Sequence, residues 1–241
     1  MPFDASLDGH RIDRLVHVSL VFMIVLLAVM IGWMVYACLR HGRRHAATCD
    51  DGNSHRAKIL PLGIAGFVLF IVDGNLLMNS THDMEQIFWN FPRAEAHPEA
   101  VRIEVNAHQW AWDARYPGAD GKFNTADDIV VLNDLRVPVN VPILFELSSV
   151  DVIHSFYLPS FRTKIDVVPG QLSKLWVQAQ KTGEYEIGCA QHCGVNHYKM
   201  RGLLTVLPHE EFRDWAQEAS AQSARAYDLA DRTAHWGWDW K

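Results

Sequence analysis

The sequence predicts two membrane-spanning helices at the N-terminal end, then an exported all-β domain of Greek-key type, and then a surface helix at the C-terminal end. Three observations predict this order in the 241-residue chain: an apolar segment near the start, a second one soon after it, and a series of short β-type runs beyond residue 100. The net charge of −6 argues against nucleic acid as a partner and suits a basic docking protein.

The first apolar segment, residues 15–39, contains no Asp, Glu, Lys or Arg. As a helix it would extend roughly 37 Å, which is enough to cross a bilayer with some tilt. The second segment, residues 59–78, is interrupted near its end by Asp73 and Asn75, so we expect that end at the membrane interface or against another protein. A buried core helix is the alternative for both segments. A cleaved signal peptide is an alternative for the first, although its apolar region is long and lacks a convincing cleavage site.

The distribution of basic residues predicts how the two helices are oriented. Residues 40–58, between the apolar segments, carry five Lys or Arg residues, whereas residues 1–14 carry two beside three aspartates. The positive-inside rule therefore places the connecting loop in the cytoplasm and both chain ends outside. Residues 1–80 would form a hairpin in the inner (plasma) membrane, and everything after it would face the periplasm or its equivalent.

The region after the hairpin divides into three parts. Residues 81–100 are expected to be a linker. Residues 101–207 contain seven short β-type runs separated by Gly, Pro or Asn-Asp clusters, which favour a Greek-key sandwich or barrel over a parallel α/β sheet. Residues 208–241 begin with an alanine-rich run whose first turn is acidic, which predicts a surface helix. They end in a tail with three tryptophans in five positions, which suggests an anchor against the membrane or a partner subunit.

The loop GCAQHCGVNHYKM, between two predicted strands, contains four candidate metal ligands: Cys189, Cys193, His197 and Met200. Structural zinc would use a second matched pair of cysteines and not a methionine. A dithiol redox site would prefer Cys-x-x-Cys. Copper electron transfer uses thiolate and imidazole with a weak axial thioether. Two thiolates are enough to bridge a pair of copper ions, and DVIHSFYLPS offers a second histidine, His154. On spacing alone copper is favoured, while zinc and the absence of a metal stay open.

Four motifs together resemble subunit II of the haem-copper cytochrome c oxidases, which carries the dinuclear copper centre CuA. They are, in the order of that family, AHQWAW (107–112), DVIHSFYLPS (151–160), KIDVVPGQLS (164–173) and the Cys-x3-Cys-x3-His-x2-Met loop. The resemblance covers most of the chain. It implies a two-helix transmembrane hairpin followed by a cupredoxin-like domain outside the membrane.

The resemblance also implies roles for individual residues. Six would ligate copper: His154, Cys189, Gln191 (through its backbone carbonyl), Cys193, His197 and Met200. The cysteines would bridge both coppers, each histidine would hold one copper, and the methionine would be a weak axial ligand. Trp110 matches the aromatic through which an external electron enters, with a packed strand aromatic as its alternative. Asp151 matches a carboxylate of the family motif and could instead cap the turn before His154.

The function implied is that of the electron-accepting subunit of a respiratory cytochrome c oxidase. An electron from a soluble cytochrome c-type donor would pass Trp110 to copper and then haem in the large subunit I, where oxygen is reduced to water. No Cys-x-x-Cys-His occurs, so no c-type haem is attached to this chain. Two other classes remain open: a copper-free quinol oxidase subunit, which the complete ligand set argues against, and a free-standing membrane-anchored copper or zinc carrier.

The chain departs from the family pattern at three places. Gln191 stands where the family usually has a glutamate that helps to hold interfacial magnesium, and a neutral amide is a weaker ligand for a hard cation, so magnesium is doubtful. Ser54 stands where the family places a glutamate at a proton-entry point, so that role is not carried over. Residues 117–129 resemble an insertion, for which a hairpin loop around Asp120-Gly121 is preferred over a calcium site. Its acids are alternatively part of a docking face for a basic cytochrome c.

Overall fold

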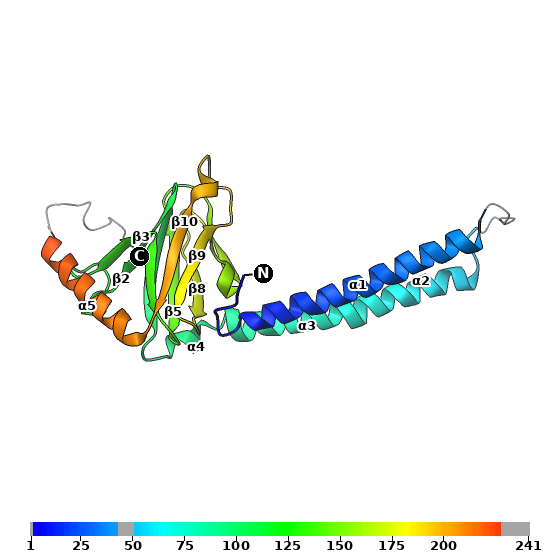
Figure 1. The fold of residues 1–241 in the computed structure, drawn as a ribbon, viewed down its shortest axis with the longest axis horizontal. Helices are drawn as coiled ribbons and strands as arrows, with labels where there is room; N and C mark the ends of the chain where they lie inside the picture. Colours follow the sequence, from blue (N-terminus) through cyan, green and yellow to red (C-terminus); the bar gives the residue numbers. More distant parts are fainter. Residues whose placement is uncertain (1, 43–50, 228–241) are drawn as a thin grey trace. The chain divides into compact units, whose positions relative to one another are not determined.

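The computed structural model describes residues 2–42 and 51–227 (Figure 1). The chain divides into two compact units. One unit is residues 11–89, and the other combines the first ten residues with everything from residue 90 onward. The tryptophan-rich end of the tail, for which we expected an interface anchor, lies outside the described residues.

The first unit consists of two long helices, as predicted from the two apolar segments. The first is α1 (Gly9–Arg40). The second continues without a break through four segments, two of which are π-helical: α2 (His55–Phe67), η1 (Val68–Asp73), α3 (Gly74–Asp83) and η2 (Met84–Phe88). Both helices are long and apolar enough to cross a membrane by length and composition.

The apolar side chains of these helices point outward. In each helix we consider the most apolar window of 18 residues. None of this window is buried in α1, and 6% of it is buried in the second helix. A soluble domain rarely exposes a continuous apolar surface of this size, and lipid or another membrane protein would remove it from water. These exposed surfaces, more than the length of the helices, distinguish them from the core helices of a soluble protein.

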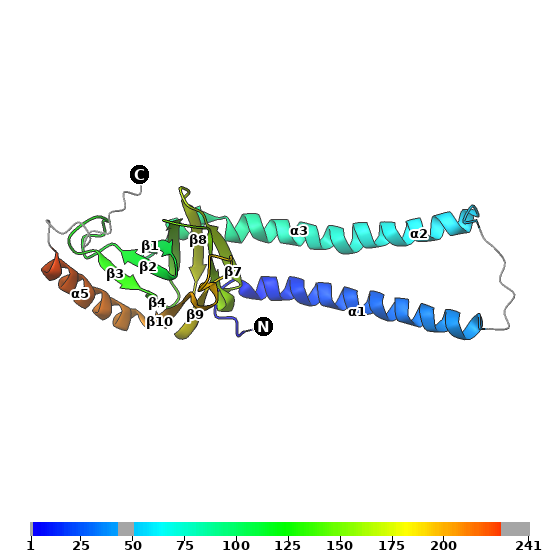
Figure 2. The same cartoon turned by 90° about the horizontal axis from the view of Figure 1, so that it is seen from above.

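The second unit is a sandwich of two five-stranded sheets, which confirms the predicted all-β domain (Figures 1 and 2). One sheet has the order β3-β2-β1-β5-β8 and the other β4-β10-β9-β6-β7. The strands are β1 (Val101–His108), β2 (Ala111–Tyr116), β3 (Ile129–Leu132), β4 (Asp134–Pro138), β5 (Pro142–Ser149), β6 (His154–Leu158), β7 (Thr163–Val167), β8 (Ser173–Gln178), β9 (Gly183–Cys189) and β10 (Arg201–Leu207). Non-consecutive strands are neighbours in both sheets, and β1 with β5 and β4 with β10 pair in parallel.

The core lies between the two sheets and is built around aromatic side chains. Trp112, Phe145 and Phe156 are almost completely buried. The ring of Phe156 lies 5.2 Å from that of Trp112, at 86°, and 5.3 Å from that of Phe145. Such edge-on and tilted packing joins the two sheets, because Phe156 belongs to one sheet and the other two rings belong to the second.

The N-terminal arm, residues 2–8, is part of this sandwich. Ala5 is completely buried in its core. The amide of Ala5 donates to the carbonyl of Ser160 over 2.9 Å, and its carbonyl accepts from the amide of Gln180 over 2.8 Å. The arm therefore adds a short strand segment beyond the end of β8, where Ser6 bridges Ala179. Since α1 begins at Gly9, the chain passes directly from the sandwich into its first helix.

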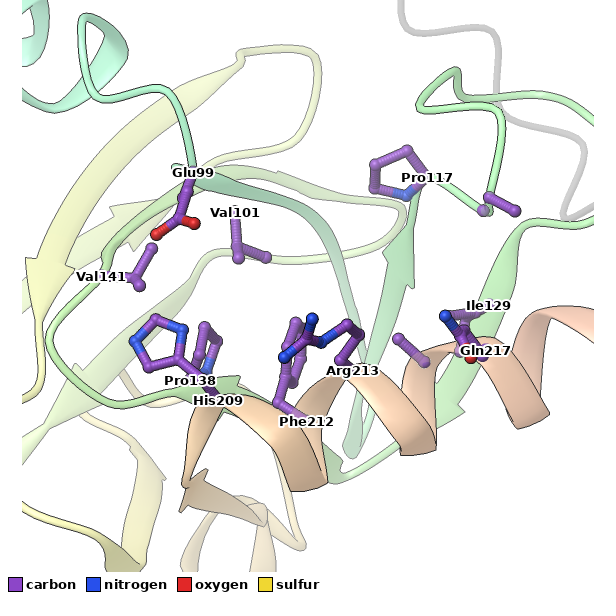
Figure 3. Close-up of a pocket in the computed structure, with 13 residues that line it drawn as sticks. Glu99, Val101, Pro117, Ile129, Pro138, Val141, His209, Phe212, Arg213 and Gln217 are labelled. Carbon is purple, nitrogen blue, oxygen red and sulfur yellow. The ribbon is translucent and has the colours of Figure 1, made fainter.

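Two further helices belong to the sandwich unit. Short α4 (Phe91–Glu95) lies within the segment expected to be a linker. The predicted surface helix is α5 (His209–Ala226), and Trp215 on it packs edge-on against Tyr116 of β2 with ring centres 5.4 Å apart. A cavity of about 360 Å³ lies beneath α5 (Figure 3). It is lined mainly by apolar side chains, among them Val101 and Phe212, and contains none of the predicted metal ligands.

Candidate metal centre

The predicted ligands meet because two strand pairings bring their ends together. β6 pairs with β9 so that Phe156 lies opposite Cys189, which places His154, at the start of β6, close to the end of β9. β9 and β10 are antiparallel neighbours, and residues 190–200 form the connection between them. The connection contains a single 3-10 turn, His197–Lys199, and closes with the amide of Cys189 facing the carbonyl of Met200 at 3.3 Å.

The two thiols lie side by side, each with one imidazole beside it. The sulfur atoms of Cys189 and Cys193 are 3.7 Å apart. The Nδ1 atom of His154 lies 4.0 Å from the sulfur of Cys189, and Nδ1 of His197 lies 3.5 Å from the sulfur of Cys193. A metal ion could be held by three or more His, Cys, Asp or Glu side chains whose ligand atoms all lie within 4.8 Å of one another. Among the described residues there is one such group, formed by His154, Cys189 and Cys193.

The remaining two predicted ligands border the same cluster. The thioether sulfur of Met200 lies 3.7 Å from the sulfur of Cys193 and 3.2 Å from Nδ1 of His154. The backbone carbonyl oxygen of Gln191 lies 3.1 Å from the sulfur of Cys189, while its side chain is exposed. Met200 is 1% exposed and His154 is completely buried, so the cluster has one side in the core and one side at the surface.

The two thiols differ in acidity. Burial would raise the pKa of Cys189, but hydrogen bonding, foremost with His154, lowers this pKa to about 6. Burial and the neighbouring Cys189 raise the pKa of Cys193 to about 12. The metal-free pair therefore releases its first proton more readily than its second. A second thiolate needs a nearby positive charge, which a bound metal ion would supply.

Asp151 fixes the orientation of His154. Its Oδ1 lies 2.8 Å from Nε2 of that ring and accepts from the amide of Val152 over 2.6 Å. Its Oδ2 accepts from the amide of Gln109 over 2.7 Å. With Nε2 held by a carboxylate, Nδ1 is left to face the sulfurs, which is the usual way in which a metal-binding histidine is oriented. Asp151 also caps the turn before His154, so both sequence-based interpretations of this residue fit the geometry.

Trp110 lies in the β1–β2 turn, half-buried against the ligand loop. A Cβ atom added at Gly194 would come within 3.4 Å of the indole and within 2.7 Å of the Gln109 amide nitrogen. That amide donates to the carbonyl of Cys193 over 2.7 Å. The turn that carries Trp110 is thus latched to the backbone of a predicted ligand.

Three residues of this arrangement were not predicted from the sequence as part of the site. Gln109 latches the ligand loop, and Gly194, at φ +117°, permits the close approach. Trp112 packs against His154 with ring centres 6.0 Å apart. The sequence offered one signal for these three residues, which is their position. Gly194 directly follows a candidate ligand, and Gln109 and Trp112 lie within two residues of Trp110.

The carboxylates of the acidic loop at residues 117–129 are paired within the loop and with neighbouring elements, since Asp127 also accepts from the hydroxyl of Ser220 and Asp128 lies 3.7 Å from the guanidinium of Arg115. Asp120 accepts from the amide of Lys122 over 2.8 Å, and Asp128 accepts from the amide of Asn124 over 2.8 Å. Among the described residues, no group of three ligands of the kind found at the thiols occurs in this loop. In the structure this loop is therefore a folded hairpin connection between β2 and β3. The six residues of β2 separate it from Trp110 by roughly 20 Å.

Comparison with known proteins identifies similar chains. Residues 101–206 match the family described as "Cytochrome C oxidase subunit II, periplasmic domain". Over 142 residues the chain is 34% identical to the alternative cytochrome c oxidase subunit 2 of Bradyrhizobium diazoefficiens, covering 50% of this chain and 51% of that one. Over 131 residues it is 32% identical to cytochrome c oxidase subunit 2 of Alkalihalophilus pseudofirmus, covering 54% and 36%. The chain thus spans about half the length of these relatives, or less.

Among solved structures, the periplasmic domain of subunit II of the cytochrome oxidase of Bradyrhizobium japonicum is 34% identical to the matching part of this chain. The match covers 52% of this chain and 96% of that domain, with a TM-score of 0.45.

Proposed function

The chain belongs to the cytochrome c oxidase subunit II family, and on that premise we propose that it is the subunit through which electrons enter a respiratory haem-copper oxidase. The observation that carries the proposal is the meeting of two thiols, two imidazoles, one thioether and one carbonyl at the end of the sandwich. His154, Cys189, Cys193, His197, Met200 and the carbonyl of Gln191 would hold a dinuclear copper centre, which would supply one-electron transfer between a soluble cytochrome c-type donor and haem in the large subunit I.

The donor set suits a pair of copper ions better than a single zinc ion. A tetrahedral zinc site would need its imidazoles to converge on the same point as the thiolates. Here His154 and His197 lie beside different sulfur atoms, and His197 is outside the group whose ligand atoms lie within 4.8 Å of one another. Two adjacent thiols with one imidazole beside each, and a thioether close by, match the soft and borderline ligands that copper prefers.

Magnesium forms no part of the proposal. The side chain of Gln191 is an amide and is exposed, and a hard cation such as magnesium prefers carboxylate oxygens. The backbone carbonyl of the same residue lies next to Cys189, so the substitution leaves the predicted copper contact in place.

We propose that Trp110 is the contact point for the donor. It is half-buried at the turn between β1 and β2, and its indole lies against Gly194, the residue that follows Cys193. Direct packing between an accessible aromatic ring and the ligand loop gives a short route for an electron. The same contact also serves the alternative role of Trp110 as a packed aromatic, and loss of electron uptake without loss of stability in Trp110→Leu would separate the two.

We propose that both helices cross the membrane, with the sandwich and the N-terminal arm on the outer side. Buried Ala5 makes the arm an integral part of the sandwich, and α1 starts only four residues later. Cleavage of α1 as a signal peptide would remove the arm from the core. Partners in this arrangement are subunit I, where oxygen is reduced, other oxidase subunits, and the soluble donor.

The test is electron paramagnetic resonance of the complete chain, purified in detergent and loaded with copper. We expect the signal of one electron shared between two copper nuclei, and its loss in Cys189→Ser. Cys38→Ser is the matched control, since Cys38 is an exposed cysteine of α1 outside the cluster, and it should keep the signal. A single-copper spectrum, or a preference for zinc, would refute the oxidase role and favour a metal carrier.

A further inference from the structure

We propose that Asp73, in the second long helix, is a contact site for a neighbouring membrane subunit, whose helix presents a cationic or hydrogen-bond-donating side chain. The inference rests on the proposed function, because it takes the chain to be one subunit of a membrane complex. It goes further by naming the residue that recognises the partner inside the membrane and the chemistry that the partner must offer.

The depth of Asp73 follows first from an ion pair at the outer ends of the helices. Arg11 of α1 and Asp83 of α3 pair over 3.0 Å, and the two helices run in opposite directions (Figure 2). The apolar run of α1 starts at Leu15, four residues from Arg11, whereas Asp73 is ten residues from Asp83. Asp73 therefore lies six residues, or about 9 Å, inside the apolar zone of the hairpin.

A count from the opposite end gives the same depth. The apolar run of the second helix starts at Ile59, and the fourteen residues from there to Asp73 extend about 21 Å. The hydrocarbon layer is about 30 Å thick, so the helix needs about 9 Å more to reach the outer boundary. Both counts place the carboxyl group of Asp73 within the hydrocarbon layer and not at its surface.

The hairpin provides no partner for this carboxyl group at that depth. Within the part of the chain that the structure describes, no hydrogen bond or ion pair to the side chain of Asp73 occurs, and the residue is exposed. By the same register, the facing part of α1 is near Val21, and the nearest polar side chains of α1, Ser19 and His17, bond carbonyls of their own helix. In contrast, the amide of Asn79 donates to the backbone carbonyl of Asn75 over 2.7 Å, so that polar pair is satisfied within its own helix.

The local backbone also distinguishes this position. The π-helical segment η1 ends at Asp73, and π-helical turns inside long helices are frequent at functional sites. An ionisable group in the membrane is costly unless a charge or a donor meets it, and such groups face the interior of a helix bundle or a water-filled cavity. An acidic group selects a basic or donating side chain, so the partner is a membrane helix with Arg, Lys, His or an amide, and not lipid.

The experiment uses the assembled oxidase and three variants of this chain: Asp73→Leu, Asp73→Glu and the control Leu77→Ala. Leu77 is also exposed and lies one helical turn away. After detergent extraction, we expect Asp73→Leu to retain about tenfold less of the large subunit than the wild type, which corresponds to about 1.4 kcal/mol. Asp73→Glu should keep most of it, and Leu77→Ala should equal the wild type.

A second measurement separates recognition from folding. Expressed without the other subunits, the Asp73→Leu chain should insert into the membrane at least as well as the wild type, because the substitution removes a charge from the apolar zone. Unchanged retention of the large subunit in Asp73→Leu would overturn the proposal, and so would failed insertion of that chain alone, which would assign Asp73 to hairpin folding.

The copper signal distinguishes this proposal from the proposed function. Asp73→Leu should keep the shared-electron signal, since the residue is outside the sandwich unit. A wild-type chain that has no such signal contradicts the copper function, whereas a wild-type signal with unchanged retention in Asp73→Leu contradicts only the assignment of Asp73. A wild-type chain that retains no large subunit overturns this proposal directly.

Discussion

Asp151 connects the two halves of the candidate centre. One carboxylate oxygen lies against Nε2 of His154, and the other accepts from the backbone of Gln109, next to Trp110. The residue that orients a predicted ligand therefore also holds the turn on which we expect the donor to dock. A small displacement of this carboxylate would therefore move both the ring of His154 and the turn that carries Trp110.

Replacing Asp151 by Asn should weaken copper binding while leaving the sandwich folded. The amide lacks the charge that favours a proton on Nε2 of His154, and loss of such a partner typically reduces metal affinity by about 10- to 100-fold. Competition for copper against a chelator of known affinity measures the effect. Asp113→Asn is the control, because Asp113 pairs with His108 and none of the predicted ligands. Equal copper affinity in Asp151→Asn and the wild type would contradict the positioning role.

Sequence spacing was enough to predict the candidate side-chain ligands, and the family resemblance added the carbonyl of Gln191, but neither predicted what holds them in place. The ligand loop is local, and its four side chains fall within twelve positions. The latch between Gln109 and the carbonyl of Cys193 joins residues 84 positions apart and involves a backbone atom, so it leaves no pattern in the sequence. Long-range contacts of this kind are decided by strand topology, which spacing does not show.

At the scale of elements, the same limit explains three strands that were not predicted. β2 contains Asp113 and Arg115, which obscure the alternation expected of a strand. Arg115 is nevertheless buried, because it bonds Glu104 on the neighbouring strand β1 and also donates to Asn124 over 2.8 Å. From sequence alone, a charged residue such as Arg115 is expected to be exposed. The strand β2 could therefore be recognised only once the ion pair between Arg115 and Glu104 was known. β4 and β7 are also short and charged, at five residues each.

The N-terminal arm is an element whose contribution can be measured. Removing residues 2–7 should destabilise the sandwich by about 3 kcal/mol, since three backbone hydrogen bonds of about 1 kcal/mol each are lost. Urea unfolding of the complete chain in detergent, followed by tryptophan fluorescence, measures the change. Phe3→Ala is the milder control. It removes only the stacking of Lys181 on the Phe3 ring, at 3.7 Å, and should cost about 0.5–1 kcal/mol. An unchanged unfolding midpoint after the deletion would show that the arm does not support the sandwich.

At the scale of the whole molecule, the two units have separate sources of stability. The sandwich has a closed aromatic core, whereas the helices expose their apolar side chains and depend on what surrounds them. The predicted copper ligands all belong to the sandwich unit. Metal binding should therefore act on one unit and leave the other unaffected.

Copper removal should lower the melting temperature of the sandwich and leave the helical signal unchanged. A ligand that binds only the folded state stabilises it by about 2.7 kcal/mol at a hundredfold excess over its dissociation constant.

The stabilisation by copper should depend on pH. Because the pKa of Cys193 is about 12, copper must displace its proton, and affinity should rise as the pH increases from 6 to 8. Cys189, with a pKa of about 6, adds to this dependence only at the lower end of the range. Calorimetry with and without a copper chelator, repeated across this pH range, measures both effects. A melting temperature that is independent of copper, or a stabilisation that shrinks as the pH rises, would mean that the thiols do not bind copper as thiolates.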